Sequence, residues 1–98
     1  MAKLTAQSTD NTSFDGVTFK ATVNQLIRAF GQPTVFDNTG EDKTNFEWDM
    51  ETESGEVFCI YDWKQYEVLG WDKAYEWHIG AISKSTAQTA KQEILKKL

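Results

Sequence analysis

The chain has 98 residues, enough for one small domain and too few for a second hydrophobic core. Its single cysteine excludes an intramolecular disulfide and a cysteine-based zinc site. The formal net charge is −5, whereas proteins that bind DNA or RNA directly normally carry a basic patch, so we do not expect direct nucleic-acid binding.

The N-terminal residues 1–13 are polar and show no hydrophobic periodicity. We expect them to form a flexible tail, followed by a single α+β domain over residues 14–98. No segment has the apolar core of a signal peptide or the roughly 20 apolar residues of a membrane span. The expected location is therefore the cytoplasm, without a membrane partner. Alternation at 17–19 is compatible with a short edge strand.

The first strong signal is a helix over residues 22–30. Its apolar residues fall at the i, i+3, i+4, i+7 spacing of one buried stripe, which comprises Val23, Leu26, Ile27 and Phe30. Thr22 and Gln25 have the spacing of a capping box, in which each side chain bonds the other residue's free backbone N–H. Gly31 suits the position after a helix, and Pro33 prevents its continuation. The pattern predicts both ends of this helix and its buried face.

A polar loop at 37–44 is followed by a predicted hairpin. Residues 46–51 alternate between apolar and acidic side chains, which predicts one buried and one exposed row. The buried row is Phe46, Trp48 and Met50, and the exposed row is Glu47, Asp49 and Glu51. A turn at 52–55 leads into a strand at 57–63, whose apolar residues on both faces indicate a central position in the sheet.

An irregular segment at 64–76 precedes a third predicted strand at 77–82. The last element is a helix from about residue 86, with Ser85 and Gln88 at capping-box spacing. Its predicted buried residues are Ala87, Ala90, Ile94 and Leu98. The order of elements predicts an α+β fold in which two short helices pack on one face of a three- to four-stranded antiparallel sheet.

The sequence offers no complete catalytic set. Cys59 lies between apolar neighbours and is expected to be buried, and His78 is expected to serve structure or ligand contact instead of acting as a base. No zinc spacing, calcium loop or phosphate-binding glycine loop is present, so we expect neither a metal nor another cofactor. The sequence therefore predicts a protein that is not an enzyme.

Aromatic residues beside charged groups, as found in interfaces and ligand clefts, mark the candidate binding site. The strand ending near residue 62 and the strand beginning near residue 76 are joined by a single excursion, so their neighbouring ends should lie close together. The candidate binding residues are Asp62, Trp63, Lys64, Tyr66, Trp71, Tyr75 and His78. Gly80, inside a strand, indicates a bulge or the close approach of another backbone or a ligand.

The segments IYDWKQY (60–66) and EWHIG (76–80), preceded by AFGQP (29–33), resemble a group of small, mostly uncharacterised bacteriophage-encoded proteins. The resemblance covers roughly residues 20–82, and Ala81 stands where the family pattern has a second glycine. It implies a phage origin and action in the host cytoplasm, but no reaction or ligand.

These observations favour a phage accessory protein that sequesters or inhibits a host component in an anti-defence role. The partner would be a host protein or a signalling nucleotide, with aromatic residues of the candidate site stacking on the base and Lys64 and Lys73 meeting phosphate. One alternative is an acidic mimic of DNA, in which carboxylates between Glu41 and Glu56 occupy a DNA-binding host protein. Another is a structural or assembly protein without independent activity. Self-association is left open.

Overall fold

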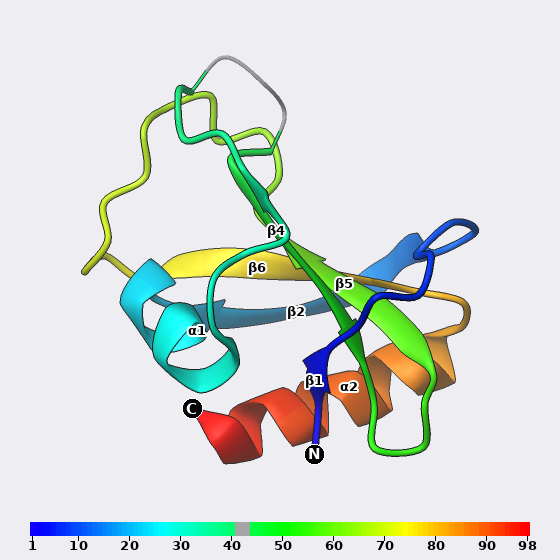
Figure 1. The fold of residues 1–98 in the computed structure, drawn as a ribbon. Helices are drawn as coiled ribbons and strands as arrows, with labels where there is room; N and C mark the ends of the chain where they lie inside the picture. Colours follow the sequence, from blue (N-terminus) through cyan, green and yellow to red (C-terminus); the bar gives the residue numbers. More distant parts are fainter. Residues whose placement is uncertain (41–43) are drawn as a thin grey trace.

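The structure, a computed structural model, describes residues 1–40 and 44–98. Figure 1 shows a single sheet with both helices below it. In chain order the elements are β1 (Lys3–Leu4), β2 (Ser13–Ala21), α1 (Val23–Phe30), β3 (Val35–Phe36), β4 (Phe46–Glu51), β5 (Val57–Tyr61), β6 (Tyr75–Ala81) and α2 (Lys84–Lys97).

Within the described residues the sheet has six strands, and every pairing in it is antiparallel. Its order is β1–β4–β5–β6–β2, and β3 pairs with β4 on the same edge as β1. The two short strands share that edge, because β1 lies opposite Met50 and Glu51 whereas β3 lies opposite Phe46 and Glu47. The α+β class and the antiparallel sheet are confirmed, but the predicted three or four strands are too few. The two-residue strands β1 and β3 have no sequence signal of their own, since their pairing with β4 defines them.

Residues of β4 define the two faces of the sheet. Phe46, Trp48 and Met50 are fully buried against the helices, as predicted. The intervening carboxylates are half-buried instead of exposed. The β5 residues that are their register partners lie on the same face of the sheet. The N-terminal segment follows the edge of β4, where the Thr5 N–H donates to the Asp49 carbonyl at 3.0 Å.

Helix α1 has the predicted ends. Thr22 Oγ1 accepts the N–H of Gln25 at 3.0 Å, and Gln25 Oε1 accepts the N–H of Thr22 at 2.9 Å, which completes the capping box. Gly31 follows with φ of 88°. Val23, Leu26 and Phe30 are buried, and Ile27 is partly buried against the core.

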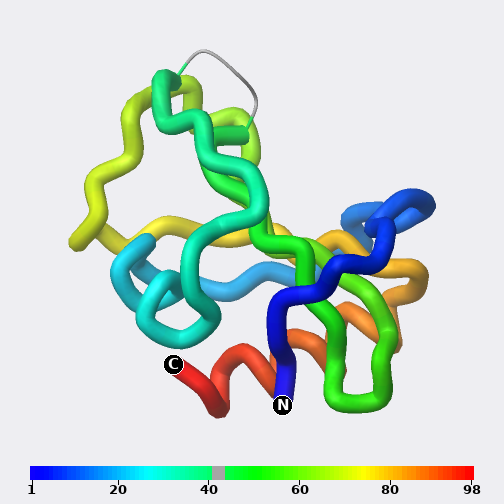
Figure 2. Tube along the Cα trace, in the orientation of Figure 1, coloured from blue at the N-terminus to red at the C-terminus, as the bar shows by residue number. Residues whose placement is uncertain are grey.

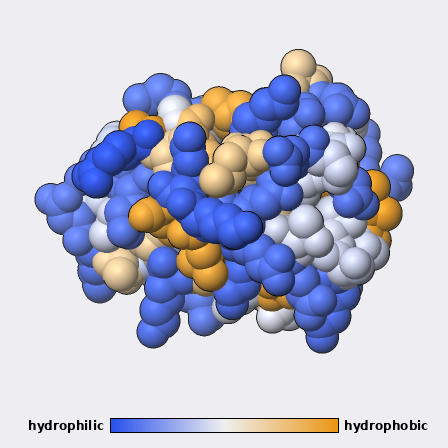
Figure 3. Space-filling view, turned by 90° about the horizontal axis from the view of Figure 1, so that it is seen from below, coloured by the Kyte–Doolittle hydropathy of each residue, from blue (hydrophilic) through white to orange (hydrophobic). Residues whose placement is uncertain are grey.

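Helix α2 begins two residues before the predicted start. Its N-cap is Ser83, whose Oγ accepts the N–H of Thr86 at 3.1 Å, so the predicted cap at Ser85 is wrong. Ala87, Ala90 and Ile94 are buried as expected, while Leu98 is 36% exposed. On this side of the molecule the surface is largely hydrophilic, with hydrophobic residues in small groups (Figure 3).

The N-terminal segment, predicted to be a flexible tail, packs on the sheet. Ala2 is buried in the core, β1 pairs with β4, and β2 already begins at Ser13. At the other end of the sheet, β5 stops at Tyr61, two residues before the predicted end, and β6 starts at Tyr75, two residues before the predicted start. The excursion between them therefore spans 62–74.

Candidate functional site

Asp62, predicted to stand at the edge of a binding surface, is fully buried. Its Oδ1 accepts the backbone N–H groups of Asn45 at 2.8 Å and Phe46 at 2.9 Å, and its Oδ2 accepts the Asn45 side-chain amide at 2.9 Å. These three hydrogen bonds all go to residues at the start of β4. The role assigned to Asp62 at a ligand site is therefore corrected to a structural one.

Two loops are joined by the same polar network. Asn45 donates its side-chain amide to the Glu67 carbonyl at 3.2 Å and accepts the Gly40 N–H at 3.0 Å. Asn38 exchanges two hydrogen bonds with the backbone of Leu69, at 2.7 and 3.1 Å. The excursion consequently runs beside the segment that precedes β4 (Figure 2). These contacts hold the excursion through its backbone and leave several of its side chains facing outward.

The aromatic residues of the excursion do not gather around one concavity. Tyr75 is buried, and its hydroxyl accepts the Gly70 N–H at 2.8 Å. Trp71 is 41% exposed and packs against the rings of Phe36 and Phe46, at centroid distances of 6.3 and 6.1 Å. Tyr66 is 53% exposed. The expected grouping of Trp71 with His78 is wrong, because these rings have different neighbours.

Trp63 and His78 lie on the other side of the sheet, joined through Tyr61. The rings of Tyr61 and Trp63 are 6.1 Å apart, and those of Tyr61 and His78 are 5.6 Å apart, both edge-to-face. Phe14 stacks on His78 with centroids 4.0 Å apart and ring planes 15° from parallel. Lys64 places its Nζ 5.6 Å from the Trp63 ring. Four rings therefore form an aromatic row, defined as Phe14, His78, Tyr61 and Trp63.

This row belongs to the face of the sheet on which no helix of the described residues packs, and which we call the open face. One cross-strand ladder on it runs Glu47, Tyr61, His78, Thr18, and the next runs Asp49, Cys59, Gly80, Phe14. Sequence reasoning missed Phe14 as a site residue and treated Glu47 and Asp49 as an exposed, solvated row. The alternation in β4 placed the carboxylates on one face, but their neighbours depend on strand register.

Gly80 makes the tight packing of the open face possible. A Cβ at this position would stand 2.9 Å from Cys59 Sγ and 3.3 Å from Tyr61 Cε1. The partner strand β2 is irregular between Phe14 and Thr18. The close approach at Gly80 is thus made by the side chains of Cys59 and Tyr61.

The carboxylates of the open face have an unusual electrostatic setting. Burial, together with hydrogen bonding to and repulsion from Asp49, raises the pKa of Glu47 to about 7. Asp49 Oδ1 is buried and has no hydrogen-bond partner among the described residues. The ion pairs within residues 1–40 and 44–98 join only the N-terminal amine to Glu53 and Glu93, at 3.6 and 3.9 Å. Among the described residues, no ion pair thus involves the carboxylates of the open face.

Cys59 and His78 are not arranged as a nucleophile and base. Burial raises the pKa of the Cys59 thiol to about 11, so it is protonated at neutral pH, and its Sγ lies 3.8 Å from Thr12 Oγ1. Burial lowers the pKa of His78, which is therefore neutral at pH 7. No group of three or more His, Cys, Asp or Glu side chains in the described part of the chain is placed to hold a metal ion.

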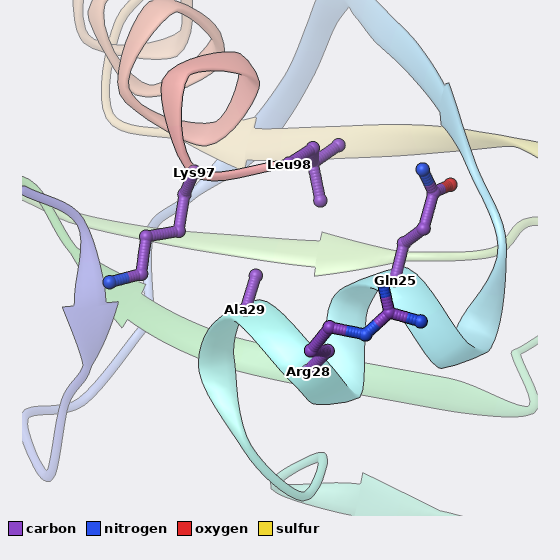
Figure 4. Close-up of a pocket in the computed structure, with 5 residues that line it drawn as sticks. All are labelled: Gln25, Arg28, Ala29, Lys97 and Leu98. Atoms are coloured by element: carbon purple, nitrogen blue, oxygen red, sulfur yellow. The ribbon is translucent and has the colours of Figure 1, made fainter.

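A hollow of about 160 Å³ lies between α1 and the end of α2. Its lining residues are Gln25, Arg28, Ala29, Lys97 and Leu98. The cationic groups of Arg28 and Lys97 point to opposite sides of the hollow (Figure 4). Both side chains belong to exposed residues, so no buried polar group is directed toward a ligand.

Part of the acidic segment considered above, residues 41–43, lies outside the described residues. Neither helix of the described chain has the length and apolarity to cross a membrane. No family model, no curated protein and no solved structure matches this chain. The resemblance to phage-encoded proteins therefore stays a prediction.

Proposed function

We propose that this protein is a non-catalytic binding protein whose open face binds a lysine- or arginine-bearing surface of another protein. The observation that carries the proposal is the row of half-buried carboxylates on β4, which form no ion pair with any described residue, beside the aromatic row. Lysine and arginine suit both the carboxylates and the aromatic row, because their charged ends pair with carboxylates and also lie over aromatic faces.

Among the functions considered from the sequence, this arrangement of carboxylates and rings favours the acidic inhibitor of a DNA-binding protein over a protein that binds a signalling nucleotide. Base stacking was assigned to aromatic residues that lie apart in the structure, and Tyr75 among them is buried beneath its loop. The lysines assigned to phosphate, Lys64 and Lys73, place their Nζ atoms 5.6 and 5.5 Å from the rings of Trp63 and Tyr75.

The partner that we propose is a bacterial host protein that meets DNA through a basic surface. The net charge of −5 supports attraction to such a surface, and the resemblance to phage-encoded proteins supports a host setting. Binding of this kind weakens as salt rises, since exposed charges are screened beyond roughly 8–10 Å at 0.1–0.15 M ionic strength.

A fluorescein-labelled nona-arginine peptide provides a direct probe in fluorescence anisotropy. We expect wild-type protein to bind it in low salt, and the Asp49→Asn/Glu51→Gln double variant to bind at least about tenfold more weakly, which is about 1.4 kcal/mol. The matched control is Glu53→Gln/Glu93→Gln, which changes net charge equally at the hairpin turn and on α2.

Equal weakening by the control pair would show non-specific attraction and would refute the open face as the binding surface. Thermal stabilisation by cyclic nucleotides, with no peptide binding, would instead support the nucleotide hypothesis. A DNA-binding host protein captured by the wild type and released by competing duplex DNA would extend the result to a natural partner.

A further inference from the structure

We propose that binding at the open face is coupled to a proton: in the free protein Glu47 and Asp49 hold one proton between them, and a partner's lysine or arginine displaces it. This inference rests on the proposed function and adds its regulation. It identifies Glu47 as the group that makes partner binding depend on pH.

The geometry of β4 brings the two acids together. Alternate residues of a strand are about 6.6–6.8 Å apart along the chain and project from the same face, so carboxylates on side chains as long as Glu and Asp can meet. Both residues are half-buried, and Asp49 Oδ1 is buried without a partner among the described residues. Two negative charges in this setting repel each other and are poorly solvated, so the pair retains a proton.

The groups around the pair leave Glu47 as the residue that titrates near neutral pH. Burial is the main cause that raises its pKa to about 7. The register partners of Glu47 are the uncharged Val35 on β3 and Tyr61 on β5, and burial raises the pKa of Tyr61. Cys59, opposite Asp49, has a pKa of about 11 and stays neutral.

Three charged or titratable groups lie farther along the same face. Glu51 is the next acid on β4, and Lys3 of β1 is its register partner. His78 of β6 lies across Tyr61, and burial lowers its pKa from the ordinary 6.5, so it gains charge only in acid. Measurements between pH 6.5 and 8 therefore report mainly on Glu47, while those nearer pH 6 need a His78 variant as a control.

The sign of the effect follows from which form the cation prefers. An arginine against the pair stabilises the fully ionised state and lowers the pKa of Glu47, so a proton leaves when the partner binds. Affinity should then rise with pH through 7 and level off above it. If only the ionised pair binds, a pKa of about 7 in the free protein gives roughly tenfold tighter binding at pH 8 than at pH 6.

The test uses the nona-arginine peptide at pH 6, 7 and 8 and constant ionic strength, because arginine keeps its charge over this range. Wild type should show the roughly tenfold ratio between pH 8 and pH 6. Glu47→Gln, which mimics the protonated acid, should bring the ratio close to one whatever its absolute affinity. His78→Gln should retain most of the wild-type ratio, since the proton is assigned to Glu47.

Carboxyl-carbon NMR supplies a second readout in the folded wild-type protein. We expect the Glu47 side-chain carbon to titrate near pH 7 in the free protein and at clearly lower pH with saturating peptide. An unchanged pH ratio in Glu47→Gln, or a Glu47 midpoint near its ordinary 4.5, would overturn the proton coupling while peptide binding upheld the proposed function. Absence of peptide binding at every pH would refute the proposed function and this inference with it.

Discussion

Asp62 offers the sharpest test of how the two loops are held on the sheet. Its carboxylate accepts two backbone N–H groups and one side-chain amide, and it is fully buried. Asp62→Ala removes every one of these acceptors. A buried donor left unpaired costs about 1–3 kcal/mol, so two backbone donors together with the loss of the amide contact should cost about 3–5 kcal/mol.

Asp62→Asn isolates the charge and the second oxygen. The substituted side chain keeps one oxygen for the N–H groups of Asn45 and Phe46 but turns an amide toward the Asn45 amide. Asn45 cannot rotate to relieve this clash without losing the bond from the Gly40 N–H, now 3.0 Å. We expect a loss of about 1–3 kcal/mol, smaller than that of the alanine variant.

Urea denaturation followed by tryptophan fluorescence measures both losses, and the exposed Asp10→Asn is a control expected to stay within about 0.5 kcal/mol. For a domain of this size each kcal/mol lowers Tm by about 4–8 °C. A loss below about 1 kcal/mol in Asp62→Ala would contradict the structural role. If that variant were also stable but defective in peptide binding, Asp62 would belong to the binding surface after all.

Three further predictions concern packing, helix capping and titration. Gly80→Ala should cost about 1–3 kcal/mol because its Cβ would meet Cys59 Sγ at 2.9 Å, and much of the loss should be recovered in a Gly80→Ala/Cys59→Ala double-mutant cycle in urea. Ser83→Ala should lower stability by about 1 kcal/mol and Ser85→Ala by much less, which thermal melts of the two variants would distinguish. Glu47 has a folded-state pKa above its ordinary value, so its stabilising contribution is present below pH 4.5 and is lost as pH rises through about 7. Glu47→Gln should therefore raise Tm relative to wild type at pH 8 and much less at pH 4, and a reversed order in thermal melts would refute the pKa shift.

Local signals determined the parts of the fold that depend on local forces. Helix α1 was predicted to its ends because periodicity, cap and terminating glycine all lie within twelve residues and act over one or two turns. The buried row of β4 was predicted equally well, because alternating side chains on a strand must face opposite sides whatever the strand's partners are.

Long-range pairing decided the remaining elements. Strands β1 and β3 contain two residues each and exist only because β4 offers them an edge. The start of α2 was ambiguous in the sequence because Ser83 and Ser85 carry the same capping group. Ser83 is the N-cap because its Oγ accepts the N–H of Thr86 once the chain leaves β6.

The candidate site depended on tertiary structure most of all. The sequence places Glu47 and Asp49 on one face, but only the strand register sets them beside Tyr61 and Cys59. Phe14 reaches His78 from a segment that carries no periodicity of its own. Burial is the main cause that raises the pKa of Glu47, and that burial arises from contacts between residues distant in the chain.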